Sequence, residues 1–277
     1  MTPCEIRWVF NALSWNPTKY QLITALSALT LEEQERIQKF YFKGDYKLCL
    51  IGRLMIRQCI KMVLGIPWKD IVLSRSIKGK PFLVNNTNGK KFFFNISHHG
   101  DFTVLAASTC SNIGVDIMKY SYPNNTDIFS FFKLMKRQFA DEEWSFIKSF
   151  KNEWDQLTTF YRLWCLKESY VKAIGTGIGT DSASSIKFKA NTTVLKSACF
   201  DSELYIKDEK QPWTFYETMI DEQHVVSVAL ESNCVNGNVL KFENVAFENL
   251  IEGCDVIEPN NCTENWWETY ITKGSKT

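Results

Sequence analysis

Apolar and polar positions along this chain follow two periods, which separate the expected strands from the expected helices. Residues 5–10 alternate apolar with charged side chains, the pattern of a half-buried strand. Thr30 and Glu33 have the spacing of a capping box, so a helix is expected to begin near residue 31. A second helix is expected over 45–64, because apolar positions recur there at helical spacing and Gly65 follows as a stop.

The middle of the chain changes to short runs typical of strands and then returns to helical patterns. Strands bounded by Gly, Asn or Pro are predicted at 71–73, 82–84, 92–96, 102–107 and 113–117. Helices are predicted at 128–138, 141–150 and 157–174, and Asp141 is the expected N-cap of the second. Further strands are predicted at 186–188, 213–216 and 225–230.

This order of helices, strands, helices and strands predicts an α+β fold made of two halves rather than one doubly wound sheet. The expected boundary lies near residue 118, which divides the chain into an N-terminal half at 1–118 and a C-terminal half at 119–243. The remaining segment, 244–277, is expected to form a short helix and a polar tail.

The composition is that of an ordinary globular protein. The chain has 277 residues, of which 45% are hydrophobic, and a formal net charge of +1, which argues against general nucleic-acid binding. Its apolar runs fall short of the roughly 18 residues that a membrane-spanning helix needs, and its first residues lack the pattern of a secretory signal. Nine cysteines, an odd number without paired spacings, are typical of reduced thiols, so a cytosolic location is expected.

Two polar segments in the N-terminal half are candidates for phosphate binding. The turn at 75–81 places three cations around a glycine, an arrangement that suits a polyphosphate, although a solvated hairpin turn has the same composition. The cluster at 95–101 follows an apolar strand and offers hydroxyl and imidazole donors, with a plain surface loop as the alternative. A zinc site is not expected, because His224 is the only other histidine and no Cys spacing supports one.

Three further charged side chains, Asp116, Glu168 and Lys172, are candidates for chemistry. Asp116 lies within an apolar strand, so it is a candidate Mg²⁺ ligand, with a buried ion pair as the alternative. Glu168 and Lys172 lie four residues apart on one helix face, but such a pair is common on solvated helices and contributes only about 0.2–0.5 kcal/mol. The Gly-rich run at 175–179 ends a helix instead of opening one, which favours helix termination over a phosphate loop.

Taken together, the segments at 75–81, 94–100, 114–118 and 164–175 resemble, in order and approximate spacing, the Sfp-type 4′-phosphopantetheinyl transferases. The resemblance covers about residues 5–230 and is clearest to the cytosolic animal members. It is carried by Gly52-Arg-Leu-Met-Ile-Arg57, Asn95-Ile-Ser-His98, Gly114-Val-Asp-Ile-Met-Lys119 and Trp164-Cys-Leu-Lys-Glu-Ser169.

The resemblance implies two similar α+β halves with the active site in the cleft between them. It implies transfer of the 4′-phosphopantetheine group from coenzyme A to a serine of an apo acyl or peptidyl carrier domain, with release of adenosine 3′,5′-bisphosphate. Coenzyme A contacts are implied at Arg36, Arg75, Ser76, Ile77, Lys78, Gly79, Lys80, Asn95, Ile96, Ser97, His98, Glu168 and Lys172. Mg²⁺ would be held by Asp116 and Glu168, with Glu168 acting on the carrier serine and Lys172 on the leaving pyrophosphate oxygen.

The chain departs from the family pattern at two positions. Bacterial members often carry a second acid where this chain has Met118, and animal members have glutamine where this chain has His99, which is therefore a third candidate metal ligand. A coenzyme A or nucleotide-binding module without catalysis is the alternative function, and such a module could dispense with Glu168. A monomer is expected, because two halves in one chain supply both walls of the cleft.

Overall fold

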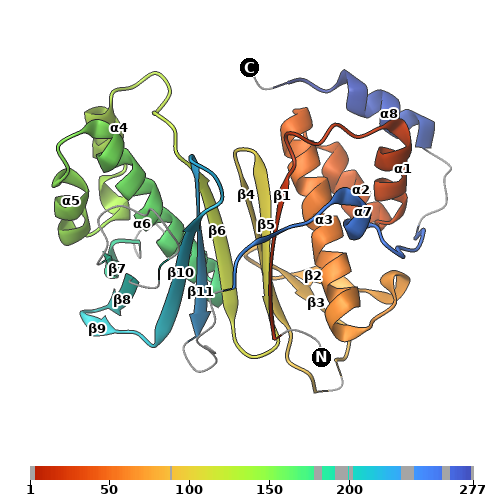
Figure 1. Cartoon of the computed structure of the whole chain (residues 1–277), viewed down its shortest axis with the longest axis horizontal. Coiled ribbons are helices and arrows are strands. Elements are labelled where there is room, and N and C mark those ends of the chain that lie inside the picture. Colours follow the sequence, from red (N-terminus) through yellow and green to blue (C-terminus); the bar gives the residue numbers. More distant parts are fainter. Residues whose placement is uncertain are drawn as a thin grey trace.

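The computed structural model describes residues 4–87, 89–177, 183–190, 199, 202–231, 240–257 and 263–275. Figure 1 shows helices on the two outer sides of the molecule and strands between them. The predicted fold class, α+β in two halves, is confirmed. In the part of the chain that the structure describes, no helix combines the length and apolar character needed to cross a membrane.

The N-terminal half is a four-stranded sheet covered on its outer face by helices (Figure 1). Its strands, in spatial order, are β12 (Glu243–Asn244), β1 (Glu5–Asn11), β5 (Phe102–Ser108) and β4 (Phe93–His99). Its first helices are α1 (Lys19–Ser27), α2 (Leu31–Gln38), α3 (Lys43–Leu64) and the 3-10 turn η1 (Trp68–Asp70). A hairpin of β2 (Leu73–Arg75) and β3 (Pro81–Leu83) lies at its lower edge in this view.

The C-terminal half repeats this layering on the other side of the molecule. Its main sheet consists of β10 (Trp213–Met219), β11 (His224–Glu231) and β6 (Ile113–Lys119), and a small one of β7 (Ile186–Ala190), β8 (Ser202–Ile206) and β9 (Glu209–Lys210). Its helices are α4 (Ile128–Leu134), α5 (Asp141–Lys148) and α6 (Glu153–Ile174), with 3-10 turns η2 (Lys136–Gln138) and η3 (Ala183–Ser185). Because β6 pairs with β11, the strand at the expected boundary belongs to this sheet; the division at residue 118 stays a prediction.

The two halves are joined by the inner faces of their sheets. Alternate side chains of β5 point to opposite sides, so Leu105 packs in the core beneath α3 while Val104 packs in a second core with β6 and β11. β4 and β6 lie next to each other at this junction, where the Asn95 side-chain oxygen accepts a hydrogen bond from the Val115 backbone N–H (3.1 Å). Both cores therefore depend on strand residues that are buried on both faces.

α6 packs directly onto β6, and the sequence makes room for it. A Cβ atom at Gly114 would lie 2.0 Å from the Ser169 carbonyl oxygen and 2.5 Å from the Ala173 nitrogen, so only glycine fits there. This close approach brings the last turns of α6 to the same junction as β4 and β6.

Two buried ion pairs fix the rotation of α6 about its axis. Arg162 pairs with Glu217 of β10 (Nε–Oε2 2.6 Å), and Lys167 pairs with Glu143 of α5 (Nζ–Oε2 2.7 Å). Breaking a buried pair leaves an uncompensated charge, so these contacts strongly favour one orientation of the helix.

The C-terminal segment returns to the N-terminal half rather than extending from it. β12 pairs with β1, and α7 (Phe247–Leu250) and α8 (Thr263–Thr272) pack on the outer helices (Figure 1). Phe247, Leu250 and Tyr270 are buried in the core of that half. The expected short helix with a polar tail is thus two helices with a buried side.

Several element boundaries differ from the sequence pattern. The pattern does not predict α1 or β8. β4 runs on through His99, since it pairs with β5 along its whole length, so the 95–99 cluster lies within a strand.

α5 has Ala140 and not Asp141 as its N-cap, because Glu143 accepts the Ala140 backbone N–H (2.9 Å). α6 begins four residues early, where Asn152 provides the cap.

Candidate functional site

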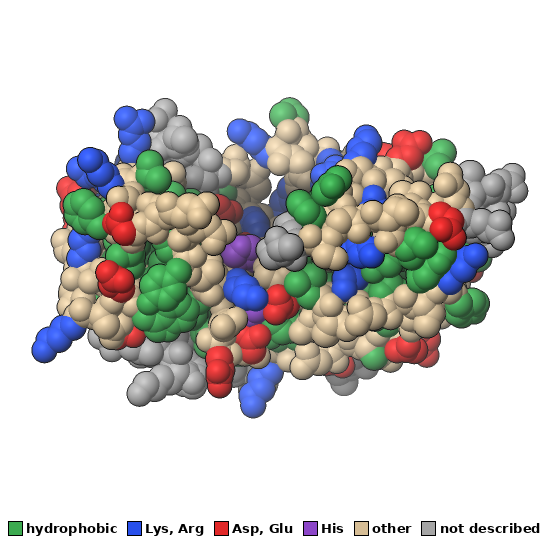
Figure 2. Space-filling view, turned by 90° about the horizontal axis from the view of Figure 1, so that it is seen from above, with side chains coloured by type: hydrophobic (Ala, Val, Ile, Leu, Met, Phe, Trp, Pro, Cys, Tyr) green, Lys and Arg blue, Asp and Glu red, His purple; other side chains and the backbone are tan. Residues whose placement is uncertain are grey.

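A cavity of about 520 Å³ lies where the two halves meet. Its walls come from α2, α3, the β2–β3 hairpin, β4 and the end of α6. Figure 2 looks into the hollow between the halves, where histidine and basic side chains gather. The predicted site residues that line the cavity are Arg36, Arg75, Lys78, Gly79, Lys80, Asn95, Ile96, Ser97, His98, Glu168 and Lys172.

Four predicted site residues lie outside this lining. Ile77 is fully exposed at the tip of the β2–β3 turn, and Ser76 shapes that turn by accepting a hydrogen bond from the Lys80 backbone N–H (3.1 Å). Asp116 lies directly behind the wall, in contact with the lining residue Ser97. His99 lies at the end of β4, beside β6.

Asp116 is the central charge of the site. Its side chain is buried, and Oδ1 accepts hydrogen bonds from the Ser97 hydroxyl (2.8 Å) and from the Lys172 ammonium (2.5 Å). Lys172 also donates to the Ser97 hydroxyl (2.7 Å), so the three groups form a closed triangle. Oδ2 of Asp116 has no hydrogen-bond partner within the described residues. The ion pair expected as the alternative is therefore present, and it leaves one carboxylate oxygen available.

Glu168 lies one helical turn before Lys172 and faces the same cavity. Burial and the neighbouring Asp116 carboxylate raise the pKa of Glu168, and the Lys172 ammonium offsets part of that shift. A cation placed beside Glu168 and Asp116 would favour the charged form of Glu168, because it offsets the repulsion between the two carboxylates.

The donor set fits a magnesium ion. Mg²⁺ is commonly held by one or two carboxylates together with water and substrate phosphates, and Asp116 and Glu168 with the unpaired Oδ2 supply the protein's share. No cluster of three or more His, Cys, Asp or Glu side chains suited to a metal occurs among the residues that the structure describes. Within the described ranges, the site thus offers two carboxylates and no complete set of metal ligands.

His99 is oriented by a backbone contact. Its Nδ1 accepts the Lys119 backbone N–H (2.7 Å), and this bond assigns the proton of the neutral ring to Nε2. An Nε2–H group donates to water or phosphate oxygen, and it cannot ligate a metal while it carries that proton. The bond disfavours direct metal ligation by His99, which stays a prediction.

The turn at 75–81, between β2 and β3, contacts the C-terminal half of the molecule. Gly79 has a φ of 83°, which only glycine adopts easily, and its carbonyl accepts a hydrogen bond from Arg75 (2.7 Å). Lys80 donates to the carbonyl oxygens of Lys172 (2.7 Å) and Ala173 (2.9 Å) at the end of α6. A cation at a helix C-terminus is favourable, so Lys80 ties the hairpin to α6. Burial lowers the pKa of Lys80.

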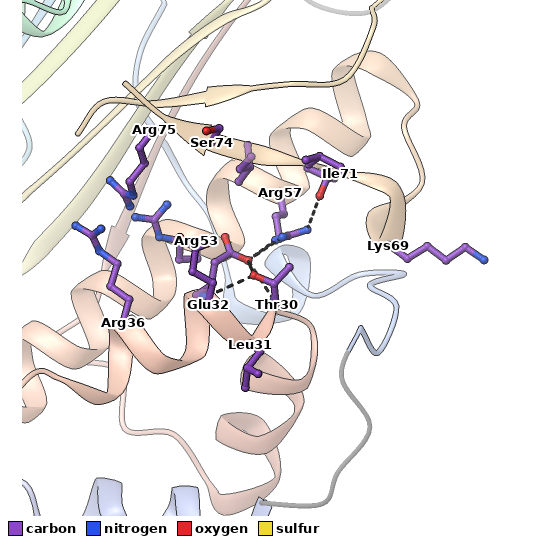
Figure 3. A pocket seen from close by; sticks show the side chains of 13 residues that line it. Thr30, Leu31, Glu32, Arg36, Arg53, Arg57, Lys69, Ile71, Ser74 and Arg75 are labelled. Carbon is purple, nitrogen blue, oxygen red and sulfur yellow. Dashed lines mark hydrogen bonds and ion pairs between the residues drawn. The ribbon is translucent and has the colours of Figure 1, made fainter. Parts of the chain in front are cut away.

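The sequence pattern does not single out every residue of the cavity wall. Arg53 also lines it, and a side cavity of about 620 Å³ shares Arg36, Arg53 and Arg75 with it. Figure 3 shows these three guanidinium groups near one another where the cavities meet. The other lining residues are Phe40, Cys49, Pro81, Val171, Gly175 and Gly177.

A signal for Arg53 exists in the sequence, but it is ambiguous. Arg53, Arg57 and Lys61 recur every four residues on one face of α3. Arg57 is buried against Glu33 of α2 (Nη2–Oε2 2.7 Å), and Lys61 donates to backbone carbonyls of the C-terminal segment. Only Arg53 of the three reaches the main cavity, which spacing alone cannot tell.

Comparisons with known proteins identify the family. The N-terminal 4′-phosphopantetheinyl transferase family model matches residues 13–110, and the model of the 4′-phosphopantetheinyl transferase superfamily matches residues 112–229. The chain is 43% identical over 230 residues to the L-aminoadipate-semialdehyde dehydrogenase-phosphopantetheinyl transferase of Homo sapiens (81% of this chain, 74% of that protein). Identity to the Xenopus laevis protein of that name is 41% over 230 residues (82% and 76%).

A bacterial relative matches over a longer stretch. The 4′-phosphopantetheinyl transferase gsp of Aneurinibacillus migulanus is 31% identical over 261 residues, which cover 94% of this chain and 96% of that protein. The chain therefore belongs to the 4′-phosphopantetheinyl transferase superfamily, as the resemblance predicted. It is a transferase that moves phosphopantetheine from coenzyme A to carrier proteins, and the alternative of a binding module without catalysis is not favoured.

The tie between Lys80 and α6 can be tested by substitution. Lys80→Met is expected to destabilise the protein by about 1–2 kcal/mol, because it removes a charged donor from two helix-end carbonyls. Lys78→Met is the matched control, since Lys78 lies on the same turn and shows no hydrogen bond to any residue of the described ranges. Urea unfolding measures both, and an equal loss of stability in the two variants would contradict the tie.

Proposed function

We propose that the cavity between the halves holds coenzyme A and Mg²⁺, and that Glu168 and Lys172 act there on the serine hydroxyl of an apo carrier domain. One observation carries the proposal: Glu168 and Lys172 line one wall of a cavity that is rich in cations, and Asp116 lies directly behind that wall in contact with Lys172. Transfer of a phosphate-linked group needs cations, because negative oxygens surround the phosphorus that is attacked. It also needs carboxylates, which can bind a metal ion or accept a proton.

Coenzyme A is a polyanion, and the cations of the N-terminal half suit its phosphates. Arg36, Arg75, Lys78 and Lys80 provide charge-assisted donors, and Arg53 adds a further guanidinium at the same end of the cavity. Gly79 lets the substrate approach the backbone of the turn closely. Ser76 and Ile77, at the outer end of that turn, remain predicted contacts. Along β4, the predicted contacts are Asn95, Ile96, Ser97 and His98.

Asp116 and Glu168 are the proposed protein ligands of Mg²⁺. When bound, the ion would neutralise the negative charge on the pyrophosphate oxygens of coenzyme A around the phosphorus that is attacked. Ser97 holds Asp116 Oδ1 and Lys172 in place, and Asp116 Oδ2, a buried oxygen without a hydrogen-bond partner in the described residues, is the proposed ligand atom. His99, with its proton on Nε2, would donate to a water or a phosphate oxygen beside this group.

The proton and the leaving group then have separate partners. Glu168 accepts the proton of the carrier serine, directly or through a water, as the serine oxygen forms a bond to phosphorus. The bond between that phosphorus and the bridging oxygen of the pyrophosphate breaks, and Lys172 stabilises the negative charge that adenosine 3′,5′-bisphosphate takes away. Burial and the Asp116 carboxylate raise the pKa of Glu168, which makes its carboxylate a stronger base than an ordinary glutamate.

The carrier type and the cellular setting are part of the proposal. The relatives from Homo sapiens and Xenopus laevis are named for L-aminoadipate-semialdehyde dehydrogenase, so a carrier domain of that protein is one proposed partner. Carrier domains of the fatty acid synthase type are proposed as well, on the family resemblance alone. A cytosolic location is supported by the nine cysteines, an odd number without paired spacings, which is typical of reduced thiols. A monomer is supported by a cavity whose walls all come from one chain.

The intact mass of an apo fatty-acid-synthase carrier domain tests the proposed reaction. Incubation with this protein, coenzyme A and Mg²⁺ is expected to add one phosphopantetheinyl group, and EDTA is expected to prevent it. A protein that binds coenzyme A but leaves the masses of this carrier and of an aminoadipate-semialdehyde dehydrogenase carrier unchanged would contradict the proposal.

Glu168→Gln separates catalysis from binding. The variant is expected to lose at least about 100-fold in transfer rate, as is typical when a general base is removed, while its affinity for coenzyme A without metal stays within a few fold. Rates are measured from carrier mass over time and affinity by calorimetry. Wild-type turnover by this variant would remove Glu168 from the proposed mechanism.

Arg53→Ala tests the additional guanidinium. A charged contact to phosphate contributes about 1.5–3 kcal/mol, so the Kd for coenzyme A is expected to rise roughly tenfold or more, as for Arg75→Ala. Lys69→Ala is the control, because Lys69 lines only the side cavity and points away from the three arginines in Figure 3. Equal weakening by Lys69→Ala would indicate a general effect of charge instead of a contact.

A further inference from the structure

The C-terminal segment reaches the connection between α2 and α3, which forms part of the cavity wall. α8 packs beside α1 on the outer side of the N-terminal half (Figure 1). Its Tyr270 is buried, with its ring 5.3 Å from that of Tyr46 on α3. This packing places the residues that follow α8 next to residues 38–43, where α2 ends and α3 begins.

Lys273 makes the principal polar contact between these two segments. Its ammonium donates to the carbonyl oxygens of Gln38 (2.9 Å) and Phe40 (2.7 Å). Gln38 is the last residue of α2, where carbonyl groups lack helical partners and a cation is favoured. The ammonium also lies 5.3 Å from the centre of the Tyr46 ring. Lys273 thus bonds two carbonyls that would otherwise need water.

Backbone bonds at the next residue hold the same connection. The Lys43 N–H donates to the Gly274 carbonyl (2.9 Å), and the Gly274 N–H donates to the Tyr41 carbonyl (3.2 Å). Four hydrogen bonds therefore join residues 38–43 to residues 273 and 274, three donated by the C-terminal residues and one by the Lys43 backbone N–H.

This connection carries residues of the cavity. Phe40 lines the cavity wall, and Arg36 lines it from the last turn of α2, two residues before Gln38. Lys273 itself lines neither of the two cavities that meet at Arg36. A displacement of the α2–α3 connection would move Phe40 and Arg36, which lie on different elements from α6, the helix that carries Glu168 and Lys172.

We propose that Lys273 is a positioning residue for the coenzyme A site: its ammonium fixes the end of α2 so that Arg36 and Phe40 keep their places in the cavity wall. The inference rests on the proposed function, because it takes this cavity as the coenzyme A site. It assigns the C-terminal segment a role in substrate affinity and none in the chemical step.

Lys273→Met tests the inference, because methionine keeps an apolar stem and removes the ammonium. Lys61→Met is the matched control: Lys61 also donates to two carbonyls, those of Glu252 and Gly253 (both 2.7 Å), and also joins the C-terminal segment to the N-terminal half, but it lines neither cavity. The Kd for coenzyme A is measured by calorimetry, KM and kcat by carrier mass, and Tm by calorimetric scanning.

The expected result for Lys273→Met is a roughly tenfold rise in Kd and KM for coenzyme A at unchanged kcat. Lys61→Met is expected to lower Tm comparably and leave Kd and KM unchanged, and Lys273→Arg is expected to restore most of the affinity. Should the methionine variant not fold, Lys273→Gln, which keeps a donor, takes its place in the same comparison.

A lower Tm with unchanged Kd, or an equal rise in Kd for Lys61→Met, would overturn the inference. A fall in kcat alone would overturn it as well. These outcomes are distinct from failure of the proposed function, which would appear in the wild-type protein as no transfer to carrier at all.

Discussion

An ionised carboxylate buried inside a protein needs partners, and the partners of Asp116 come from elements far apart in the chain. Ser97 reaches it from β4 and Lys172 from α6, while Asp116 itself lies on β6. A buried charge without such partners is costly. The arrangement of β4, β6 and α6 is therefore constrained by one side chain, and it is at this junction that the cavity between the halves opens.

Other charged contacts set the positions of the elements around this junction. Arg162 and Lys167 fix α6 through buried partners, and Gly114 lets that helix approach β6. On the other wall, Arg57 and Glu33 join α3 to α2. Cations that are paired in this way hold the scaffold, whereas Arg36, Arg53 and Arg75 gather beside the cavity, where a polyphosphate can neutralise them.

Local pattern was sufficient at two helix boundaries that hydrogen bonds within a few residues decide. The capping box at Thr30 and the stop at Gly65 are both present, because each depends on hydrogen bonds within a few residues. The same kind of signal precedes α1, where Thr18 and Gln21 form a capping box, although the apolar pattern behind it is too short to reveal the helix. The extension of β4 through His99 has no local signal, since it comes from pairing with β5.

In the candidate site, too, local pattern predicts the residue types but not the contacts between distant residues. Residue types at strand and helix ends indicated phosphate and metal chemistry, but the contact of Asp116 with Lys172 joins residues 56 positions apart, which no periodicity contains. Spacing on α3 likewise could not separate Arg53 from Arg57, because their environments depend on α2 and the β2–β3 hairpin. The candidate role of Asp116 as a metal ligand came from its place in an apolar strand, whereas the roles of Glu168 and Lys172 came only from resemblance to a family.

The central claim is that Asp116 holds one oxygen ready for a divalent cation beside bound coenzyme A. Binding of Mn²⁺, which takes the same oxygen ligands as Mg²⁺, tests it directly by electron paramagnetic resonance in the presence of coenzyme A. We predict one bound Mn²⁺ per chain in the wild-type protein and at least a roughly tenfold weaker Kd in Asp116→Asn, with coenzyme A affinity in metal-free buffer reduced much less. Equal Mn²⁺ affinity in the two proteins would contradict the account.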